Sequence, residues 1–247
     1  MKVSFVIPSY NCSTFLPHAV ESVKNQTYKD WEIVIVDDCS TDSTKDLTDH
    51  YQKTEKNIIV HRNEKNLGRS ESRNIGNKLA TGDIICVLDA DDLADPKRAA
   101  LTVGKFKHGA KVVYGSAVII DAIGFQYNRL QADFIGKPKI KRIVDKMSSP
   151  DAKPSDFHLG IVHSSMAYSK EIAEKYPYQG GKIAELGIDD WDMQVRMVLD
   201  GVSMDVIPAI ITHYRMTPSN ITSTRDPKAV MDQKVEILKS LVVTQCA

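Results

Sequence analysis

The sequence predicts an α/β fold in which a single domain is built on a mostly parallel sheet flanked by helices. Over the first ninety residues, short β-rich runs alternate with segments whose apolar residues recur at helical spacing. The run over residues 84–88 is wholly apolar, which is typical of a central strand covered on both faces. The chain has 247 residues, 42% of them hydrophobic, which is enough for one substantial core.

The elements of the first half follow from local signals. Predicted strands cover residues 3–7, 31–36, 58–60 and 84–88. Residues 16–23 carry an apolar face at helical spacing, and Ser13 is the predicted N-cap of this helix. A second helix follows the capping residues 40–43, and a third covers residues 70–80. Strands and helices therefore alternate, as a parallel sheet requires.

The second half gives a less regular pattern. Asp95 is the predicted N-cap, and Pro96 the first residue, of a helix that ends near residue 106. Residues 124–157 show no sustained period, so we expect a loop-rich segment there. The remaining predicted elements are strands at 112–114 and 117–120, an ordered segment at 161–168, and helices at 191–201 and 230–242.

Composition narrows the class of protein. Lys plus Arg and Asp plus Glu number 32 each, so no excess of positive charge points to nucleic acid as a partner. No run of 18 apolar residues predicts a membrane span, and the N-terminal residues do not resemble a signal peptide. The four cysteines are far apart and form no CxxC pair, so we expect reduced thiols and a cytoplasmic location.

Acidic residues follow two of the predicted strands. Asp37 and Asp38 come after the second strand, and Asp89, Asp91 and Asp92 come after the apolar run. Ligands of open α/β sheets bind outside the carboxyl ends of the strands, so both clusters should lie in one crevice. Closely spaced carboxylates repel one another unless a cation compensates, which indicates Mg²⁺ or Mn²⁺ and, with it, a phosphate-bearing nucleotide. For the first pair alone, an ordinary turn is an equally good explanation.

Six motifs together resemble the inverting glycosyltransferases of family 2, which have the Rossmann-like GT-A fold. They occur in the family's order over about the first hundred residues, and several motifs in register are far more specific than one. The matching segments are residues 6–11, 26–28, 32–42, 66–68, 72–76 and 88–92. The resemblance implies a sugar transferred from a nucleoside-diphosphate donor to an acceptor hydroxyl, of a glycan or another molecule.

The resemblance also implies roles for residues near the nucleotide. Asp38 matches the family residue that accepts a hydrogen bond from the base, usually uracil, so a UDP-sugar is the expected donor. Arg73 matches an arginine near the base and diphosphate. Pro8, Ser9 and Tyr10 are candidates for the base pocket, and Ala90 for contact with the nucleotide. The candidate metal ligands are Asp91, Asp89 and Asp92, of which Asp89 and Asp92 would also contact the ribose.

A later acidic pair is similar to the family's Glu-Asp motif. Asp189 stands where Glu is usual, and Asp190 matches the catalytic base. Either residue could instead cap the helix that follows. His213 and Arg215 belong to a segment similar to the family's C-terminal element, which implies an accessory role at the diphosphate. Thr217 occupies the usual His position there, so His213 is either a substitute or a structural histidine.

The predicted organisation is a domain over residues 1–225, divided into a nucleotide-binding half, 1–92, and an acceptor-binding half, 93–225. A C-terminal helix covers residues 226–247. Two other functions remain open from the residues: a nucleotide-sugar-binding module without catalysis, and a nucleotidyltransferase. A nucleotidyltransferase should carry a Gly-rich, Arg-containing loop after the first strand, where this chain has Pro8-Ser9-Tyr10-Asn11.

Overall fold

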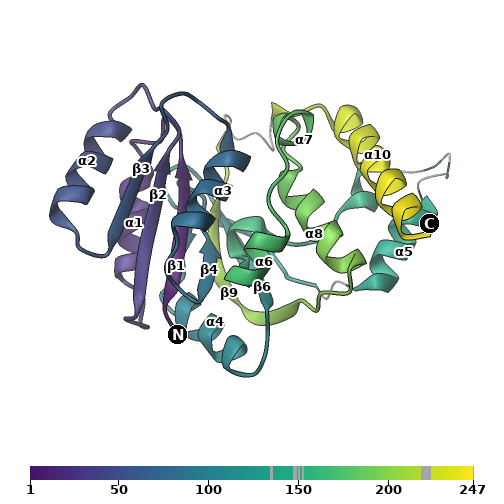
Figure 1. Cartoon of the computed structure of the whole chain (residues 1–247), viewed down its shortest axis with the longest axis horizontal. Helices are drawn as coiled ribbons and strands as arrows, with labels where there is room; N and C mark the ends of the chain where they lie inside the picture. Colours follow the sequence, from purple (N-terminus) through teal and green to yellow (C-terminus); the bar gives the residue numbers. More distant parts are fainter. Residues whose placement is uncertain (134–135, 147–148, 150, 152, 218–223, 247) are drawn as a thin grey trace.

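The computed structural model describes the whole chain except residues 134–135, 147–148, 150, 152, 218–223 and 247. Its strands form one sheet in the order β3-β2-β1-β4-β8-β6-β9-β5, with β7 paired to β6. Helices lie against the sheet and form a second group beside it (Figure 1). This arrangement confirms the predicted α/β class.

The first four strands of the sequence are parallel, as predicted. They are β1 (Val3–Ser9), β2 (Trp31–Asp37), β3 (Ile58–Arg62) and β4 (Ile84–Val87). Strand β1 pairs with both β2 and β4, and β2 pairs with β3. Their carboxyl ends therefore lie at the same edge of the sheet, and the segments after β2 and β4 are brought together there.

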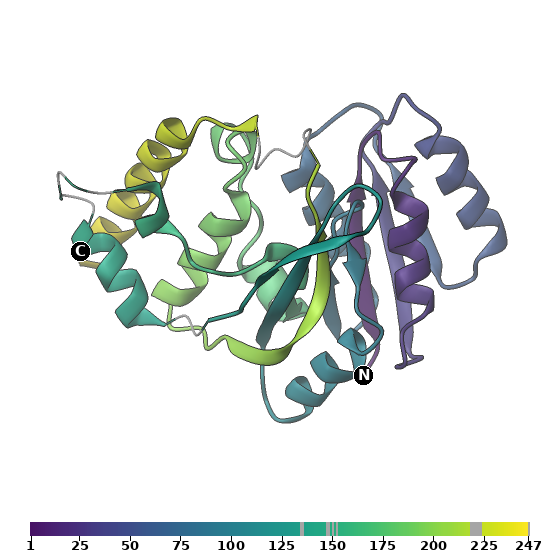
Figure 2. The same ribbon diagram turned by 180° about the vertical axis from the view of Figure 1, so that it is seen from behind.

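Alternate residues of these strands face two separate hydrophobic clusters. Phe5 and Ile33 pack on one face, and Val6 and Val34 pack on the other. Helix α3 (Arg69–Leu79) covers one face (Figure 1), and α1 (Leu16–Lys24) covers the opposite face (Figure 2). Burial on both faces explains why these strands are almost continuously apolar.

Helix α3 lies unusually close to the sheet because residue 76 is glycine. A Cβ at Gly76 would lie 2.4 Å from Cγ1 of Val6 and 3.3 Å from Cγ2 of Val36. Both neighbours are strand residues of the buried core, so neither side chain has room to move away. The glycine thus fixes the distance between the sheet and the helix that carries Arg69 and Arg73.

Two predicted helix starts were wrong. Helix α1 begins at Leu16 with Phe15 at the N-cap position, and the backbone N–H of Ser13 donates to Asp42 instead. Helix α4 (Arg98–Lys107) begins after Asp95, whose carboxylate accepts a hydrogen bond from the backbone of Lys97 in a turn. Short polar side chains serve turns as well as caps, so local sequence does not separate the two. Helix α2 (Thr44–Thr54) follows residues 40–43 as predicted.

The second half of the sheet contains both parallel and antiparallel strand pairs. The predicted strands 112–114 and 117–120 are one strand, β6 (Val112–Ile120), with register irregularities near its middle. It pairs in parallel with β9 (Asp205–Arg215) and antiparallel with β8 (Ala167–Ser169) and β7 (Gln126–Leu130). The short β5 (Leu93–Ala94) pairs with β9. The sequence analysis had assigned no strand to β5, β7 or β9.

The segment 124–157 contains more regular structure than expected. Besides β7, it forms α5 (Lys137–Lys146) and the 3₁₀ turn η1 (Pro154–Phe157). The residues of β7 are all exposed, so no alternation of apolar and polar residues marks this strand in the sequence. The segment 161–168 is also divided, between the 3₁₀ turn η2 (His163–Ser165) and β8.

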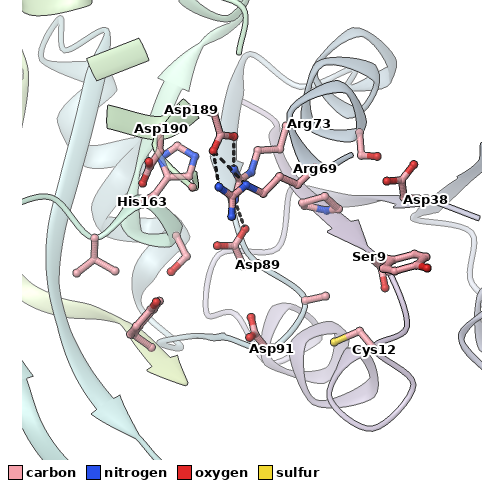
Figure 3. Close-up of a pocket in the computed structure, with 18 of the residues that line it drawn as sticks. Ser9, Cys12, Asp38, Arg69, Arg73, Asp89, Asp91, His163, Asp189 and Asp190 are labelled. Carbon is pink, nitrogen blue, oxygen red and sulfur yellow. Dashed lines mark hydrogen bonds and ion pairs between the residues drawn. The ribbon is translucent and has the colours of Figure 1, made fainter. Parts of the chain in front are cut away.

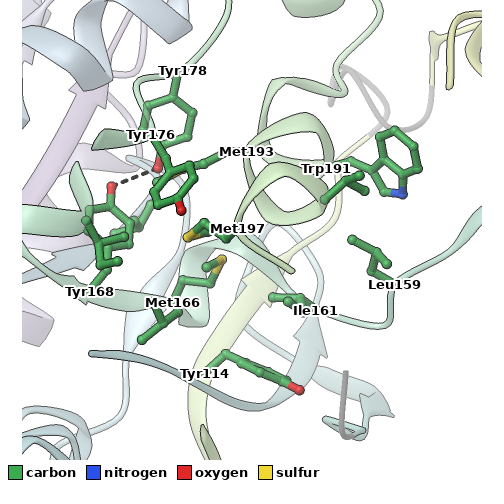
Figure 4. Packing of buried hydrophobic residues seen from close by; sticks show 14 of the residues in the cluster. Tyr114, Leu159, Ile161, Met166, Tyr168, Tyr176, Tyr178, Trp191, Met193 and Met197 are labelled. Atoms are coloured by element: carbon green, nitrogen blue, oxygen red, sulfur yellow. Dashed lines mark hydrogen bonds between the residues drawn. The ribbon is translucent and has the colours of Figure 1, made fainter. Parts of the chain in front are cut away.

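The C-terminal helices pack around a core beside the sheet. They are α6 (Lys170–Lys175), α7 (Lys182–Glu185), α8 (Asp189–Leu199) and α10 (Pro227–Cys246). Trp191 and Met197 of α8 lie in this core with Ile161 (Figure 4). Val230 and Leu238 of α10 belong to the same cluster, so the C-terminal helix is part of the core. Among the described helices, none is long and apolar enough to cross a membrane.

Candidate active site

A cavity of about 440 Å³ lies at the carboxyl ends of the parallel strands. Residues from β1, α3, the segment after β4 and the start of α8 line it (Figure 3). It contains most of the predicted site: Pro8, Ser9, Tyr10, Asp38, Arg73, Asp89, Ala90, Asp91, Asp189 and Asp190. Residues as far apart in sequence as Pro8 and Asp190 therefore share one cavity, and the parallel strands account for the part that follows β1, β2 and β4.

Asp38 is a buried carboxylate at the end of this cavity formed by β1 and β2. Its oxygens accept hydrogen bonds from the side chain of Asn63 at 2.7 Å and from the backbone N–H groups of Leu67 and Gly68 at 2.8 Å each. An ionised carboxylate has about four acceptor positions, so one remains for a ligand. Asp38 thus orders the loop before α3 and can still accept a hydrogen bond within the cavity.

Arg73 connects the acidic residues of two distant segments. Its Nη1 donates to Oδ2 of Asp189 at 2.8 Å, and its Nη2 donates to Oδ1 of Asp89 at 2.7 Å (Figure 3). Asp189 also accepts hydrogen bonds from Arg69 and Ser70, at 3.0 Å each. Burial alone would raise the pKa of Asp189, but the charges of Arg73 and Arg69 lower it overall. Asp189 is therefore ionised and engaged in ion pairs.

Asp190 has a different environment from its neighbour. Its Oδ1 accepts a hydrogen bond from the backbone N–H of Trp191 at 2.8 Å, and no cation of the described residues lies within ion-pair distance. Ile188 occupies the N-cap position of α8, so neither Asp189 nor Asp190 caps the helix through its side chain. Both lie in the first turn, where the helix dipole favours negative charge. Of the two, Asp190 is the carboxylate available to a ligand.

Asp89 and Asp91 form the acidic wall below Arg73. Burial would raise the pKa of Asp89, but the charge of Arg73 lowers it overall. Burial and the negative charge of Asp89 instead raise the pKa of Asp91 to about 6. A carboxylate that is partly desolvated beside another carboxylate is stabilised by a cation. The chemistry of this pair therefore fits a divalent ion.

Asp92 does not belong to the cavity wall. One of its oxygens accepts a hydrogen bond from the hydroxyl of Ser164, and the other accepts one from the backbone N–H of Arg215 at 2.7 Å. The side chain is fully buried between the segment after β4 and β9. The structure therefore separates Asp92 from the other predicted metal ligands and gives it contacts that join two parts of the sheet.

His213 and Arg215 are likewise absent from the cavity wall, whereas Tyr214 lines it. All three belong to β9, and side chains alternate between the two sides of a strand. Arg215 donates from Nε to the carbonyl oxygen of Asp91 at 2.8 Å, and from Nη1 to those of Asp121 and Ala122. Arg215 thus supports the backbone that carries Asp91. Of the three β9 residues, Tyr214 is the one that lines the cavity.

The cavity residues that the sequence analysis missed include Arg69 and His163. Arg69 is one helical turn before Arg73, so its position on the same face of α3 could have been inferred. His163 is buried, and its Nε2 lies 2.9 Å from the hydroxyl of Tyr178. Burial and the charge of Arg73 lower the pKa of His163 to about 4, so it is neutral at pH 7. No local pattern marks His163, because it lies in a 3₁₀ turn.

The fold and the cavity define a GT-A protein, and comparisons with known proteins agree. The chain belongs to the family described as glycosyl transferase family 2, whose sequence profile matches residues 4–177. An uncharacterized glycosyltransferase of Methanocaldococcus jannaschii is 30% identical over 218 residues, which are 87% of this chain and 70% of that protein. The resemblance inferred from the motifs is thus confirmed.

Two solved structures show the same fold. Staphylococcus aureus TarS 1-349 in complex with UDP-GlcNAc has a TM-score of 0.68 at 18% identity, over 92% of this chain and 62% of that one. The mannosyltransferase PcManGT of Pyrobaculum calidifontis, in complex with GDP-Man and Mn²⁺, has a TM-score of 0.66 at 17% identity. The match covers 98% of this chain and 64% of that one. The chain spans about two thirds of each of these structures.

Proposed function

We propose that this protein transfers a sugar from a nucleoside-diphosphate donor to an acceptor hydroxyl, with inversion at the anomeric carbon. The observation that carries the proposal is the contrast between Asp189 and Asp190 in one cavity. Two arginines engage Asp189, whereas Asp190 makes no ion pair with a described residue. An unpaired carboxylate in the same cavity as a metal-binding acidic pair has the position that a general base needs.

The nucleotide occupies the end of the cavity formed by β1 and β2. Pro8, Ser9 and Tyr10 line the pocket for the base. The remaining acceptor position of Asp38 accepts a hydrogen bond from the imide N–H of uracil. Adenine has no ring N–H to donate there, and guanine presents an amino group beside its N1–H for which Asp38 has no further acceptor position, so a UDP-sugar is the proposed donor. Ala90 lies beside the nucleotide at the turn after β4.

Mn²⁺ or Mg²⁺ is the proposed cofactor, held by Asp91 and Asp89. No group of three acidic, His or Cys ligands converges on one point within the described part of the chain. These ions usually take one or two carboxylates from a protein and complete their coordination with water and substrate phosphates. When bound, the ion stabilises the negative charge of the departing diphosphate. Arg73 adds a fixed positive charge on the same side of the cavity.

Asp190 accepts the proton of the acceptor hydroxyl as the oxygen attacks the anomeric carbon. The new carbon–oxygen bond forms on the face opposite the breaking bond to the diphosphate, and the nucleoside diphosphate leaves. Asp189 acts indirectly, because its ion pairs hold the start of α8 against α3. A cytoplasmic location is also part of this proposal.

A screen of nucleotide sugars with Mn²⁺ tests the function. We expect release of nucleoside diphosphate, by slow hydrolysis even without an acceptor, from one donor and not from the others. A binding module without catalysis would bind the nucleotide and release nothing. In a parallel incubation with nucleoside triphosphates and sugar 1-phosphates, formation of a nucleotide sugar with release of pyrophosphate would identify a nucleotidyltransferase and contradict the proposal.

A further inference from the structure

A second, smaller pocket opens beside Asp190. Its volume is about 50 Å³, several times the roughly 10–15 Å³ that one water molecule requires, yet small for a sugar ring. Asp190 lines both this side pocket and the main cavity. The other polar walls of the side pocket include Gln194 of α8 together with Arg225 and Lys234 of the C-terminal segment. A group bound there would lie next to the proposed base.

Lys234 brings a buried positive charge to this side pocket. The residue is only 6% exposed, and its Nζ donates to the carbonyl oxygen of Phe157 at 3.3 Å and lies 4.9 Å from the ring centroid of Trp191. No carboxylate of the described residues is within ion-pair distance of it, and the residues outside the described set include no Asp or Glu. Asp190 of the same pocket raises the pKa of Lys234 but lies beyond ion-pair distance, so the buried charge is only partly compensated, which is costly.

Arg225 adds a second cation to the same wall. Its Nη1 donates to the carbonyl oxygen of Gly187 at 2.9 Å, and a guanidinium has further N–H donors to offer. Burial, together with the charge of Arg225 and against the opposing effect of Asp190, lowers the pKa of Lys234 to about 8. Burial followed by the charges of Lys234 and Arg225 also lowers the pKa of His158, another residue of the pocket.

Packing alone does not account for this pair of cations. An aliphatic side chain at position 234 would cover Trp191 without the cost of burying a charge, and it would not repel Arg225. An anion bound between the two would satisfy both. The diphosphate of the donor is not that anion, because Asp89, Asp91 and Arg73, which we assign to it, do not line the side pocket.

We propose that the side pocket binds an anionic group of the acceptor, a phosphate or a carboxylate, so that the acceptor hydroxyl next to it meets Asp190. The proposal rests on the function given above, since it takes Asp190 as the base. Lys234 and Arg225 would then select charged acceptors and orient them, while the donor occupies the main cavity. Phosphate and carboxylate share this chemistry, and the experiment below distinguishes them.

The test uses the indole N–H of Trp191 as a local reporter. The chain has two tryptophans, and Nε1 of Trp191 donates to the same Phe157 carbonyl oxygen as Lys234. Protein labelled with ¹⁵N-tryptophan, saturated with Mg²⁺ and UDP, is titrated with glycerol 3-phosphate against glycerol, and with glucuronate against glucose. We expect at least one anion to shift the Trp191 signal saturably, with its neutral counterpart at least tenfold weaker and the Trp31 signal unchanged.

Substitutions locate the binding site. Lys234→Met keeps the packing on Trp191, Arg225→Gln keeps a polar side chain, and Lys239→Gln on the exposed side of the same helix is the control. We expect the first two to weaken anion binding at least tenfold and the control to leave it unchanged. Equal binding of charged and neutral probes, no shift with either anion, or full binding in Lys234→Met would overturn the proposal.

The same samples separate this proposal from the function on which it rests. Release of nucleoside diphosphate from the donor without acceptor should remain within about twofold of the unmodified protein in Lys234→Met, since Lys234 lines only the side pocket, whereas Arg225 also lines the main cavity. Absence of donor cleavage in the unmodified protein would contradict the proposed function. Donor cleavage without selective anion binding would contradict the side-pocket proposal alone.

Discussion

Asp189 accepts a hydrogen bond from Nη1 of Arg73 at 2.8 Å, although 116 positions separate the two residues in sequence. Both side chains are almost fully buried, and Arg73 also binds Asp89. The pair therefore joins the helix beside the nucleotide end of the cavity to the helix that carries Asp190. Through this contact the proposed base is held at a fixed distance from the proposed metal ligands.

The first prediction separates the roles of the two acids of α8. Asp190→Asn should lower turnover by roughly a hundredfold or more while UDP affinity and melting temperature change little, because only the proton acceptor is removed. Asp189→Asn leaves Arg73 and Arg69 without their shared counter-ion. Since loss of one partner of a buried pair costs about 3–5 kcal/mol, its melting temperature should fall by roughly ten degrees.

Sugar transfer, UDP titration and thermal unfolding of both variants provide the measurements. Near-normal transfer by Asp190→Asn, together with a folded but inactive Asp189→Asn, would move the base one residue earlier. If both variants remain active, the base lies outside this motif.

A second prediction concerns metal removal. UDP affinity, measured by titration calorimetry, should fall sharply in EDTA and in Asp91→Asn, because the diphosphate would then meet uncompensated carboxylates. Asp232→Asn, an exposed carboxylate on α10, is the matched control and should bind as the unmodified protein does. Undiminished affinity in both EDTA and Asp91→Asn would exclude Asp91 as a metal ligand.

The raised pKa of Asp91 gives a third prediction, on pH. Burial first, and then the charge of Asp89, raise this pKa to about 6, so the ionised form is lost as the pH falls through that value. Only the ionised form binds a cation well. Metal-dependent affinity for UDP-glucose should therefore weaken about tenfold between about pH 7.5 and pH 5, since about one tenth of the carboxylate is then ionised.

UDP-glucose is the ligand for this titration because its diphosphate, unlike that of UDP, has no secondary ionisation near pH 6. The dependence should disappear in Asp91→Asn, whose residual affinity is uniformly low. A profile that stays flat in the unmodified protein would show that Asp91 does not control metal binding.

The fourth prediction concerns the base of the donor. Competition among UDP, TDP, GDP and ADP should favour the two pyrimidine nucleotides, because the one acceptor position left on Asp38 matches a single imide N–H, whereas adenine has no ring N–H and guanine presents an amino group as well. Asp38→Asn should reduce this preference. If GDP binds tenfold more tightly than UDP, a difference of about 1.4 kcal/mol, the assignment of the base pocket is wrong.

The sequence by itself determined the first four strands and the acidic segments that follow β2 and β4. Those strands are buried on both faces, so nearly every residue is apolar and the pattern is readable without knowledge of the partners. Parallel pairing then brings the carboxyl ends together, and this places Asp38, Asp89 and Asp91 in one crevice. The family motifs in these segments added the candidate roles.

Only the tertiary structure decided which residues of each motif face the cavity. Asp92 turns to Ser164 and to the backbone of Arg215, while Tyr214 faces the cavity in place of its two neighbours. The ion pairs of Asp189 and the cations beside Asp190 likewise join segments far apart in sequence. The direction of a side chain and its partner depend on strand pairing and helix packing over long range, and local sequence does not encode either.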